Sequence, residues 1–305
     1  MPTRLDSPEA VLAGLDRHDY LADLGLATTI YLAIGMNRPL LLEGAPGVGK
    51  TEVAKALAAM TGGRLIRLSC YEGIDASQAL YEWDHARQLL HLRVAEASGR
   101  TAGADWADTA LEHELYDERF LTRRPLLDAI TCGEDPPPVL LIDEVDRADD
   151  EFEAFLLEVL ADWSVTVPEV GTFTAERPPI AVLTSNRSRD VHDALKRRCL
   201  YHWLDHPGHE REVAIVRRRV PELDGTVAAQ VASLVQGFRA EHLYKAPGVA
   251  ETIDWARALA LLGIHELDVD TVTATLGAVV KYHEDQARVR VGLPELVRRV
   301  VEAGG

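Results

Sequence analysis

Short apolar runs alternate with amphipathic stretches along the first two thirds of the chain. The apolar runs predict buried strands at 40–42, 64–70, 139–142, 180–184 and 200–204. Apolar residues at helical spacing predict helices at 19–34, 51–60, 79–97, 151–160 and 191–198, with further helical pieces over 107–129. An uninterrupted apolar run is typical of a strand buried on both faces of a parallel sheet. The alternation therefore predicts an α/β fold, in three αβα layers, with helices on both faces of a parallel sheet.

The pattern changes at Pro207-Gly208, after the last predicted strand. Beyond it we find no strand pattern, and helical spacing predicts helices at 210–220, 227–242, 253–262, 270–285 and 293–301. A chain of 305 residues has room for about two domains. We therefore expect an αβα domain over residues 1–206 and an all-helical domain over residues 207–305. Inside the first domain, 165–167 and 172–174 flank a short loop and predict a β-hairpin.

Composition narrows the function classes. The formal net charge is -17, and such a surface repels nucleic acid and anionic membranes. Cys70, Cys132 and Cys199 are widely spaced and form no C-x-x-C pair, so we expect neither disulfides nor a cysteine zinc site. The N-terminus lacks the apolar run of a signal peptide, and no apolar stretch of about 18 residues occurs. We therefore expect a cytoplasmic protein with no nucleic-acid partner and no stable membrane insertion.

The residues after the first strand fit the phosphate-loop pattern G-x-x-x-x-G-K-[ST], called Walker A. They are Gly44, Ala45, Pro46, Gly47, Val48, Gly49, Lys50 and Thr51, and Glu52 follows them into the next helix. The glycines let the backbone turn its N–H groups around phosphate oxygens, and the helix N-terminus favours the same anion. Lys50 can reach the β- and γ-phosphates, and the Thr51 hydroxyl can bind Mg²⁺. The pattern predicts a site for ATP and Mg²⁺.

Two carboxylates, Asp143 and Glu144, follow the apolar run 139–142 and complete a Walker B pattern. Asp143 would hold Mg²⁺ through water. Glu144 would orient and polarise the attacking water, which must lie in line with the γ-phosphate. This second motif extends the prediction from nucleotide binding to hydrolysis.

Polar residues further along the chain could complete the site. Asn186 follows the run 180–184 and could donate to the γ-phosphate or the attacking water, although an asparagine after a strand is often only a turn residue. Arg197 and Arg198 could supply an arginine finger to the γ-phosphate in a neighbouring subunit. We favour Arg198; the alternative is a solvated basic helix end. Arg257 could swing from the helical domain onto the nucleotide, or be an exposed helix arginine.

Two other groups of polar residues give weaker indications of function. His202, His206 and His209 have a spacing that would suit a metal on a helix, but Pro207 breaks any helix there, so we expect no metal site. The basic run 217–219 could contact a polyanion, yet is more typical of a solvated helix face. Neither feature changes the prediction of a nucleotide-hydrolysing protein.

Walker A, Walker B, Asn186, the paired arginines and a helical C-terminal part occur here in the order seen in AAA+ ATPases, and the chain resembles that superfamily over nearly its whole length. Within it the chain resembles the MoxR branch, and most specifically the CoxD-type ATPases of carbon monoxide dehydrogenase (molybdenum hydroxylase) maturation. The stretches that carry this resemblance are 70–75, 80–90, 142–148, 151–158, 183–187 and 197–203. One departure lies in the string Glu-Val-Asp-Arg at 144–147. Many MoxR proteins have Asn after the Walker B Glu-Ile, whereas this chain has Asp146 after Glu-Val, as the CoxD-like group does.

The resemblance implies several properties that spacing alone does not. A helix-2 insertion at about 71–100 and a pre-sensor-1 hairpin at about 164–176 would face a client or partner. Asn186 would be sensor 1, and Arg257 would be sensor 2 on a helical lid domain. The active form would be a homo-oligomer, a hexameric ring with nucleotide between subunits. Such ATPases are commonly paired with a protein that carries a von Willebrand factor A-type domain, and together they remodel, or load metal into, a client metalloenzyme.

Three functions therefore compete at this point. The first is an ATP-hydrolysing maturation chaperone. The second is an AAA+ ATPase that acts on nucleic acid as a loader or motor, which the net charge of -17 disfavours because no basic groove is visible. The third is a small-molecule P-loop kinase, which the long helical C-terminus and the paired arginines disfavour. We expect the first.

Overall fold

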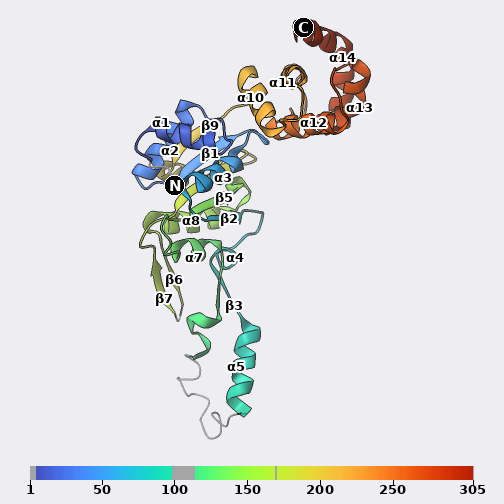
Figure 1. Cartoon of the computed structure of the whole chain (residues 1–305). Helices are drawn as coiled ribbons and strands as arrows, with labels where there is room; N and C mark the ends of the chain where they lie inside the picture. Colours follow the sequence, from blue (N-terminus) through green and yellow to red (C-terminus); the bar gives the residue numbers. More distant parts are fainter. Residues whose placement is uncertain (1–4, 98–113, 169, 305) are drawn as a thin grey trace.

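A computed structural model describes residues 5–97, 114–168 and 170–304. Its centre is a parallel five-stranded sheet with the strand order β2-β5-β8-β1-β9. The strands are β1 Leu40–Gly44, β2 Leu65–Ser69, β5 Val139–Asp143, β8 Ile180–Ser185 and β9 Leu200–Leu204. Each predicted strand is present, so the α/β fold with a parallel sheet and flanking helices is confirmed (Figure 1).

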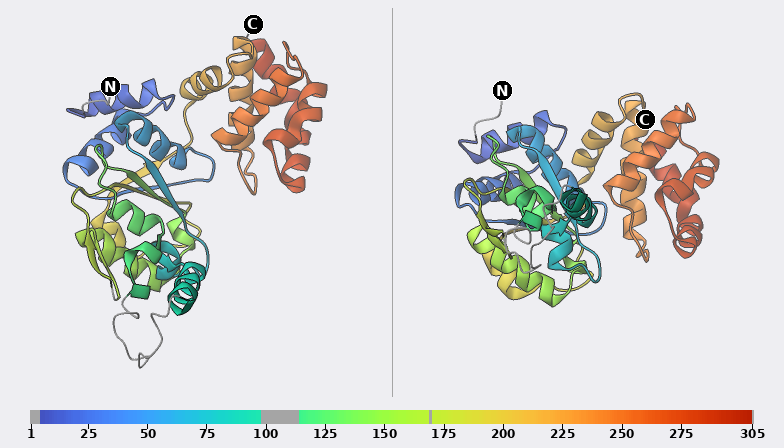
Figure 2. Two further views of the ribbon diagram at one scale, coloured as in Figure 1. Left: turned by 60° about the horizontal axis from the view of Figure 1, so that its bottom comes forward. Right: turned by 90° about the horizontal axis from the view of Figure 1, so that it is seen from below.

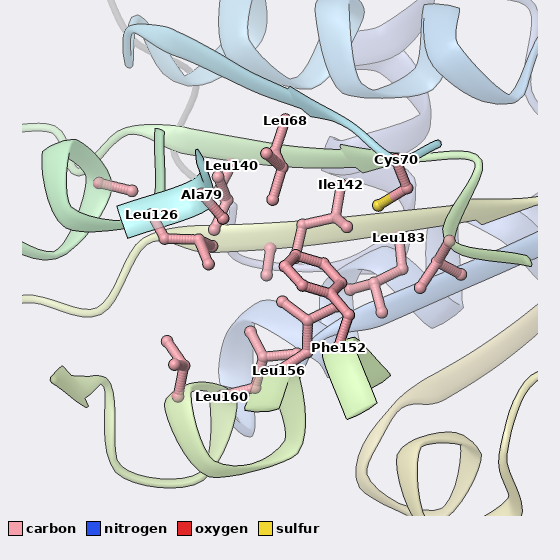
Figure 3. Close-up of a cluster of buried hydrophobic side chains, with 14 of the residues drawn as sticks. Leu68, Cys70, Ala79, Leu126, Leu140, Ile142, Phe152, Leu156, Leu160 and Leu183 are labelled. Atoms are coloured by element: carbon pink, nitrogen blue, oxygen red, sulfur yellow. The ribbon is translucent and has the colours of Figure 1, made fainter. Parts of the chain in front are cut away.

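Helices cover both faces of this sheet because successive strand residues point to opposite sides. Leu40 and Leu42 of β1 pack with α1 Pro8–Arg17, α2 Leu24–Gly35 and α3 Lys50–Thr61. Leu140 and Ile142 of β5 point the other way and pack with α7 Pro125–Ile130 and α8 Asp150–Asp162. Figure 3 shows this second core, in which the β5 side chains meet Phe152, Leu156 and Leu160 of α8. The two cores fix the strand register, and the register aligns the carboxyl ends of β1, β5 and β8 at one edge.

Helix α2 is shorter than predicted. The spacing predicted 19–34, but the helix begins at Leu24, where the Asp23 side chain accepts a hydrogen bond from Leu26 N at 2.8 Å. Asp19 has a φ of 59°, which no α-helix accommodates, so the four residues before the cap stay outside the helix. Gly35 is the last helical residue, and Met36 caps the end.

The prediction of one helix over 79–97 is wrong. A capping box between Asp75 and Gln78 starts a short helix, α4 Ala76–Leu80, and the chain then becomes extended in β3 Tyr81–Trp83 before α5 His85–Ala97. The partner of β3 is β4 Leu121–Arg123, which follows the 3₁₀ turn η1 Glu118–Phe120. Of the helical pieces predicted over 107–129, residues 107–113 lie outside the described part of the chain. Residues 114–115 and α7 are helical, whereas η1 and β4 lie between them.

Two antiparallel pairs extend from the sheet on the side away from the C-terminal helices (Figure 1). One is the pair β3–β4 with α5 beyond it. The other is the predicted hairpin, β6 Ser164–Val167 and β7 Gly171–Thr174, which is confirmed. In Figure 1 both lie below the sheet, while the C-terminal helices lie above it.

The C-terminal helices surround a buried cluster of their own (Figure 2). They are α10 His209–Arg219, α11 Gly225–Ala240, α12 Val249–Leu261, α13 Val269–Val279 and α14 His283–Gly304, and they follow α9 Asp193–Arg198 and β9. The predicted helix 270–285 is interrupted, because Val280 is extended and buried and a new helix starts at His283. None of the helices in the described ranges is long and apolar enough to cross a membrane. The division at 206/207 stays a prediction.

Candidate nucleotide-binding site

A cavity of about 460 Å³ opens where the phosphate loop, the strand ends and the C-terminal helices meet. Residues 46–52 form one wall, and α10 and α12 form another. Apolar and aromatic side chains also line the cavity and suit a flat base; they are Tyr20, Leu21, Leu204, Ile215, Val249 and Ile253. Burial raises the pKa of the Tyr20 hydroxyl. Sequence reasoning missed these side chains, because they come from segments far apart in the chain.

The phosphate loop has the backbone that its glycines allow. Gly47 and Gly49 have φ values of 79° and 99°, a region that side-chain-bearing residues rarely adopt. Gly44 has another role: a Cβ there would lie 2.3 Å from the Leu204 carbonyl oxygen of β9. Gly44 and the neighbouring Ala45 do not line the cavity themselves, but their carbonyl oxygens hold Lys50 in place.

Lys50 is held at the loop by its own backbone. Its ammonium donates to the carbonyl oxygens of Gly44 at 2.8 Å and Ala45 at 2.9 Å. Burial lowers the pKa of this ammonium, and the nearby carboxylates, led by Asp146, oppose that shift. The Lys50 charge is thus desolvated and already close to the place where a phosphate would sit.

Asp143 is the most densely bonded carboxylate of the cavity. Its Oδ1 accepts from Thr51 Oγ1 at 3.1 Å and from Thr184 Oγ1 at 2.6 Å, and its Oδ2 accepts from Arg67 at 2.6 Å. The side chain is 6% exposed, so the guanidinium balances a charge that water hardly reaches. Thr51 and Asp143, predicted to share a metal, are brought together, while Thr184 and Arg67 were missed.

Glu144 leaves the strand in a left-handed conformation, with φ 58°, which turns its side chain into the cavity. Its backbone N–H donates to Thr184 Oγ1 at 2.9 Å. Its Oε1 accepts from Asn186 Nδ2 at 3.3 Å, and its Oε2 lies 3.0 Å from Arg147 Nε. The predicted pair of Glu144 and Asn186 is therefore in contact, and Arg147 adds a cation that the sequence did not single out.

The remaining predicted residues differ in position. Glu52 lines the cavity, where its carboxylate pairs with Lys55 at 2.6 Å. Arg257 also lines it, from α12, and lies 3.6 Å from Asp254. Arg197 and Arg198 do not line the cavity: they sit exposed at the end of α9, and within the described residues neither guanidinium has a hydrogen bond or ion pair.

The three histidines do not converge. His209 Nε2 bonds to Ser233 Oγ at 2.8 Å, and His202 Nδ1 lies 3.4 Å from Thr29 Oγ1 on α2. Burial lowers the pKa of His206, and no hydrogen bond reaches its Nδ1 in the part of the chain that the structure covers. The described ranges hold no group of three metal-ligating side chains.

Comparison with known proteins places this site in a family. Residues 39–199 match the family AAA domain (dynein-related subfamily). The ATPase family AAA domain-containing protein 3A homolog of Drosophila melanogaster is 34% identical over 102 residues, which are 30% of this chain and 17% of that protein. The chain thus spans less than a fifth of the length of this curated relative.

Solved structures with similar folds share little sequence. A putative ATPase from Cytophaga hutchinsonii is 14% identical, with a TM-score of 0.47, over 97% of this chain and 92% of that one. The Thermotoga maritima RuvB Holliday junction branch migration motor is 16% identical, with a TM-score of 0.44, over 90% of this chain and 71% of that one. The family match covers more than half of the chain and includes both nucleotide motifs. The chain belongs to the AAA domain family, dynein-related subfamily.

Proposed function

We propose that this protein is an AAA+ ATPase that binds ATP with Mg²⁺ in the cavity. It would work as a chaperone that remodels a client metalloenzyme or helps load its metal. The observation that carries the catalytic part is one cavity wall on which Lys50, Thr51, Asp143, Glu144 and Asn186 meet. The loop N–H groups and Lys50 would hold the phosphates. The apolar side chains that line the cavity would hold the base.

The residues around Asp143 fit a Mg²⁺ ion. Thr51 Oγ1 and Asp143 Oδ1 are oxygen donors 3.1 Å apart, and Mg²⁺ prefers oxygen donors. Asp143 Oδ2 is bonded to the Arg67 guanidinium, so Oδ1, which faces the Thr51 hydroxyl, is the carboxylate oxygen that would hold the ion. Thr51 and Asp143 would hold the Mg²⁺ ion, which would supply positive charge to neutralise the phosphates.

Glu144 would accept a proton from water as the water oxygen bonds to the γ-phosphorus and the bond to the ADP oxygen breaks. A carboxylate oxygen has two acceptor sites, so Asn186 can stay bonded to Oε1 while Glu144 accepts this proton. Asn186 would then fix the direction in which Glu144 points. Arg257, on the opposite wall, would contact the phosphates from α12.

The positions of Arg197 and Arg198 support a homo-oligomer, which we propose to be a hexameric ring. Both guanidiniums lie outside their own cavity and have no partner within the described residues. An unpaired guanidinium at the surface can reach the γ-phosphate of a second copy and stabilise the charge that develops there.

The part of the chain that would meet a client is the extension formed by β3, α5 and β4, which lies far from the C-terminal helices (Figure 1). On α5, Leu89, Leu90 and Val94 are 54%, 63% and 60% exposed. Neighbouring apolar side chains at helical spacing suit an apolar protein surface. The resemblance to CoxD-type ATPases and the net charge of -17 support a protein client, with a von Willebrand factor A-type partner.

Leu90→Glu tests this proposal. We expect it to abolish the increase in phosphate release that a purified partner with a von Willebrand factor A-type domain produces, while basal turnover stays as in wild type. Leu262→Glu is the matched control, because Leu262 is 60% exposed in the segment after α12. Equal stimulation of both variants would contradict a surface on α5 that binds the partner, and salt-dependent binding of DNA or RNA strands would favour the nucleic-acid alternative instead.

A further inference from the structure

The start of α12 contacts the phosphate loop directly, between Gly248 and Gly47. The N–H groups of Val249 and Ala250, at the start of α12, donate to the Gly47 carbonyl oxygen at 2.9 Å and 3.3 Å. A Cβ on Gly248 would lie 2.8 Å from Gly47 Cα and 2.8 Å from the Pro46 carbonyl oxygen. The two backbones are therefore in direct contact, with no space for a side chain between them.

A buried network holds Gly248 in place from the opposite side. Both terminal nitrogens of Arg239 donate to Glu212, at 2.7 Å each, and Arg239 Nε donates to the Pro247 carbonyl oxygen at 2.8 Å. Thr252 Oγ1 lies 2.8 Å from Glu212 Oε1 and 3.0 Å from the Gly248 carbonyl oxygen. Both carbonyl groups of the Pro247–Gly248 turn are thus bonded to the network.

Burying these two charges costs free energy, so a gain in stability does not by itself explain the network. Glu212 is fully buried and the Arg239 side chain is only 11% exposed, so both charges have lost most of their water. An ion pair in such a place seldom stabilises more than apolar residues of similar size, and its best-supported use is to fix one arrangement. Here the arrangement that it fixes is the turn that meets the phosphate loop.

We propose that Gly248 is a positioning residue for the nucleotide, and that Glu212, Arg239 and Thr252 hold it against the phosphate loop. By bonding to the Gly47 carbonyl oxygen, the start of α12 keeps the loop in the conformation whose N–H groups face the cavity. The same helix carries Ile253 and Arg257 to the cavity wall. This inference rests on the proposed binding of ATP at this loop.

The contact also couples the two parts of the chain energetically. If it favours the binding conformation of the loop, bound nucleotide must strengthen the contact by the same free energy. Loss of the contact should therefore weaken binding, while the chemistry at Glu144 proceeds normally once nucleotide is bound.

Gly248→Ala tests the contact. Both Gly248 and Gly208 precede a C-terminal helix and have negative φ values, -86° and -64°, which alanine tolerates. A Cβ on Gly208 meets nothing within 4 Å, so Gly208→Ala is the matched control. We expect Gly248→Ala to raise the Kd of a fluorescent ADP analogue and the KM for ATP roughly tenfold, since overpacking at a tight contact forces the backbones apart. The kcat at saturation should match that of Gly208→Ala, and the Tm of the nucleotide-free protein shows that the variant is folded.

A second pair of variants tests the network. Thr252→Val removes the hydroxyl and keeps the shape, so it should raise the Kd of the analogue by a smaller factor, and Thr252→Ser should restore it. Wild-type Kd in both Gly248→Ala and Thr252→Val would overturn the inference. Failure of the wild-type protein to bind the analogue would instead overturn the proposed ATP site, so the two results are distinguishable.

Discussion

The cavity and the exposed end of α9 differ in whether their charged side chains have partners within the chain. In the cavity, Lys50, Asp143 and Glu144 each have partners within the chain. At the end of α9, Arg197 and Arg198 have none among the described residues, although α9 itself is anchored: Arg38 Nε donates to the Arg198 carbonyl oxygen at 2.9 Å. An anchored backbone with free guanidiniums suits a contact made outside the chain. The difference suggests that binding is built into one copy, whereas full catalysis needs a second.

Arg198→Ala should have the largest effect and tests the α9 side. Loss of an arginine finger lowers turnover by roughly 10³- to 10⁵-fold, because the developing phosphate charge loses its partner. Nucleotide affinity should stay as in wild type, since Arg198 lies outside its own cavity. Steady-state phosphate release and analogue binding give the two numbers. Arg299→Ala, another exposed arginine, is the control, and Arg197→Ala shows which of the pair acts. A large change in nucleotide affinity with little change in turnover would contradict the proposal that Arg198 acts in catalysis and not in binding.

Glu144→Gln tests the cavity, and we expect it to lower turnover by a smaller factor than Arg198→Ala does. The variant keeps the size of the side chain but cannot accept the water proton, so turnover should fall roughly tenfold to a thousandfold while ATP still binds. Lys50→Ala should lose binding as well, because it removes the only loop side chain with a positive charge. The measurements are phosphate release and ATP affinity, with Glu266→Gln as a control on an exposed glutamate. Turnover like wild type in both variants would show that the site is elsewhere.

The smallest effect concerns pH and His206, a half-buried histidine between Asp205 and Pro207, which line the cavity. Burial, reinforced by Arg239, lowers the pKa of His206 below its usual 6.5, against the opposing carboxylates Glu212, Asp205 and Glu251. A lowered folded-state pKa means that the unfolded chain takes up the proton first as pH falls. The His206 contribution to stability is therefore complete above about pH 6.5 and is lost as the pH falls toward the folded-state pKa.

We accordingly expect Tm to fall between pH 7.5 and pH 5.5 by less in His206→Gln than in wild type, with His18→Gln as a control on an exposed histidine. An identical fall in wild type and His206→Gln would mean that His206 does not sense pH.

Features encoded by consecutive residues were predicted well from the sequence. The apolar runs became β1, β5 and β8 because each is buried on both faces, whatever the rest of the chain does. The phosphate loop and the Asp143-Glu144 pair are likewise contiguous, so the pattern alone located them.

Features created by the order of strands were not predicted. Arg67 and Thr184 reach Asp143 because β2 and β8 lie on either side of β5, an order that local patterns do not contain. The strand β3 was taken for helix, since three residues have no clear period and only β4 makes them a strand. The contact between Gly248 and Gly47 joins two distant segments, and nothing near Gly248 in the sequence indicates it.

The most direct test of whether catalysis requires a second copy of the chain is to mix two inactive variants. Glu144→Gln retains Arg198, and Arg198→Ala retains Glu144, so a mixed assembly contains sites with an intact cavity from one copy and an arginine from the next. We expect each variant alone to be nearly inactive and the mixture to recover phosphate release. No recovery in mixed assemblies that are shown to form would contradict the claim that catalysis requires a second copy of the chain.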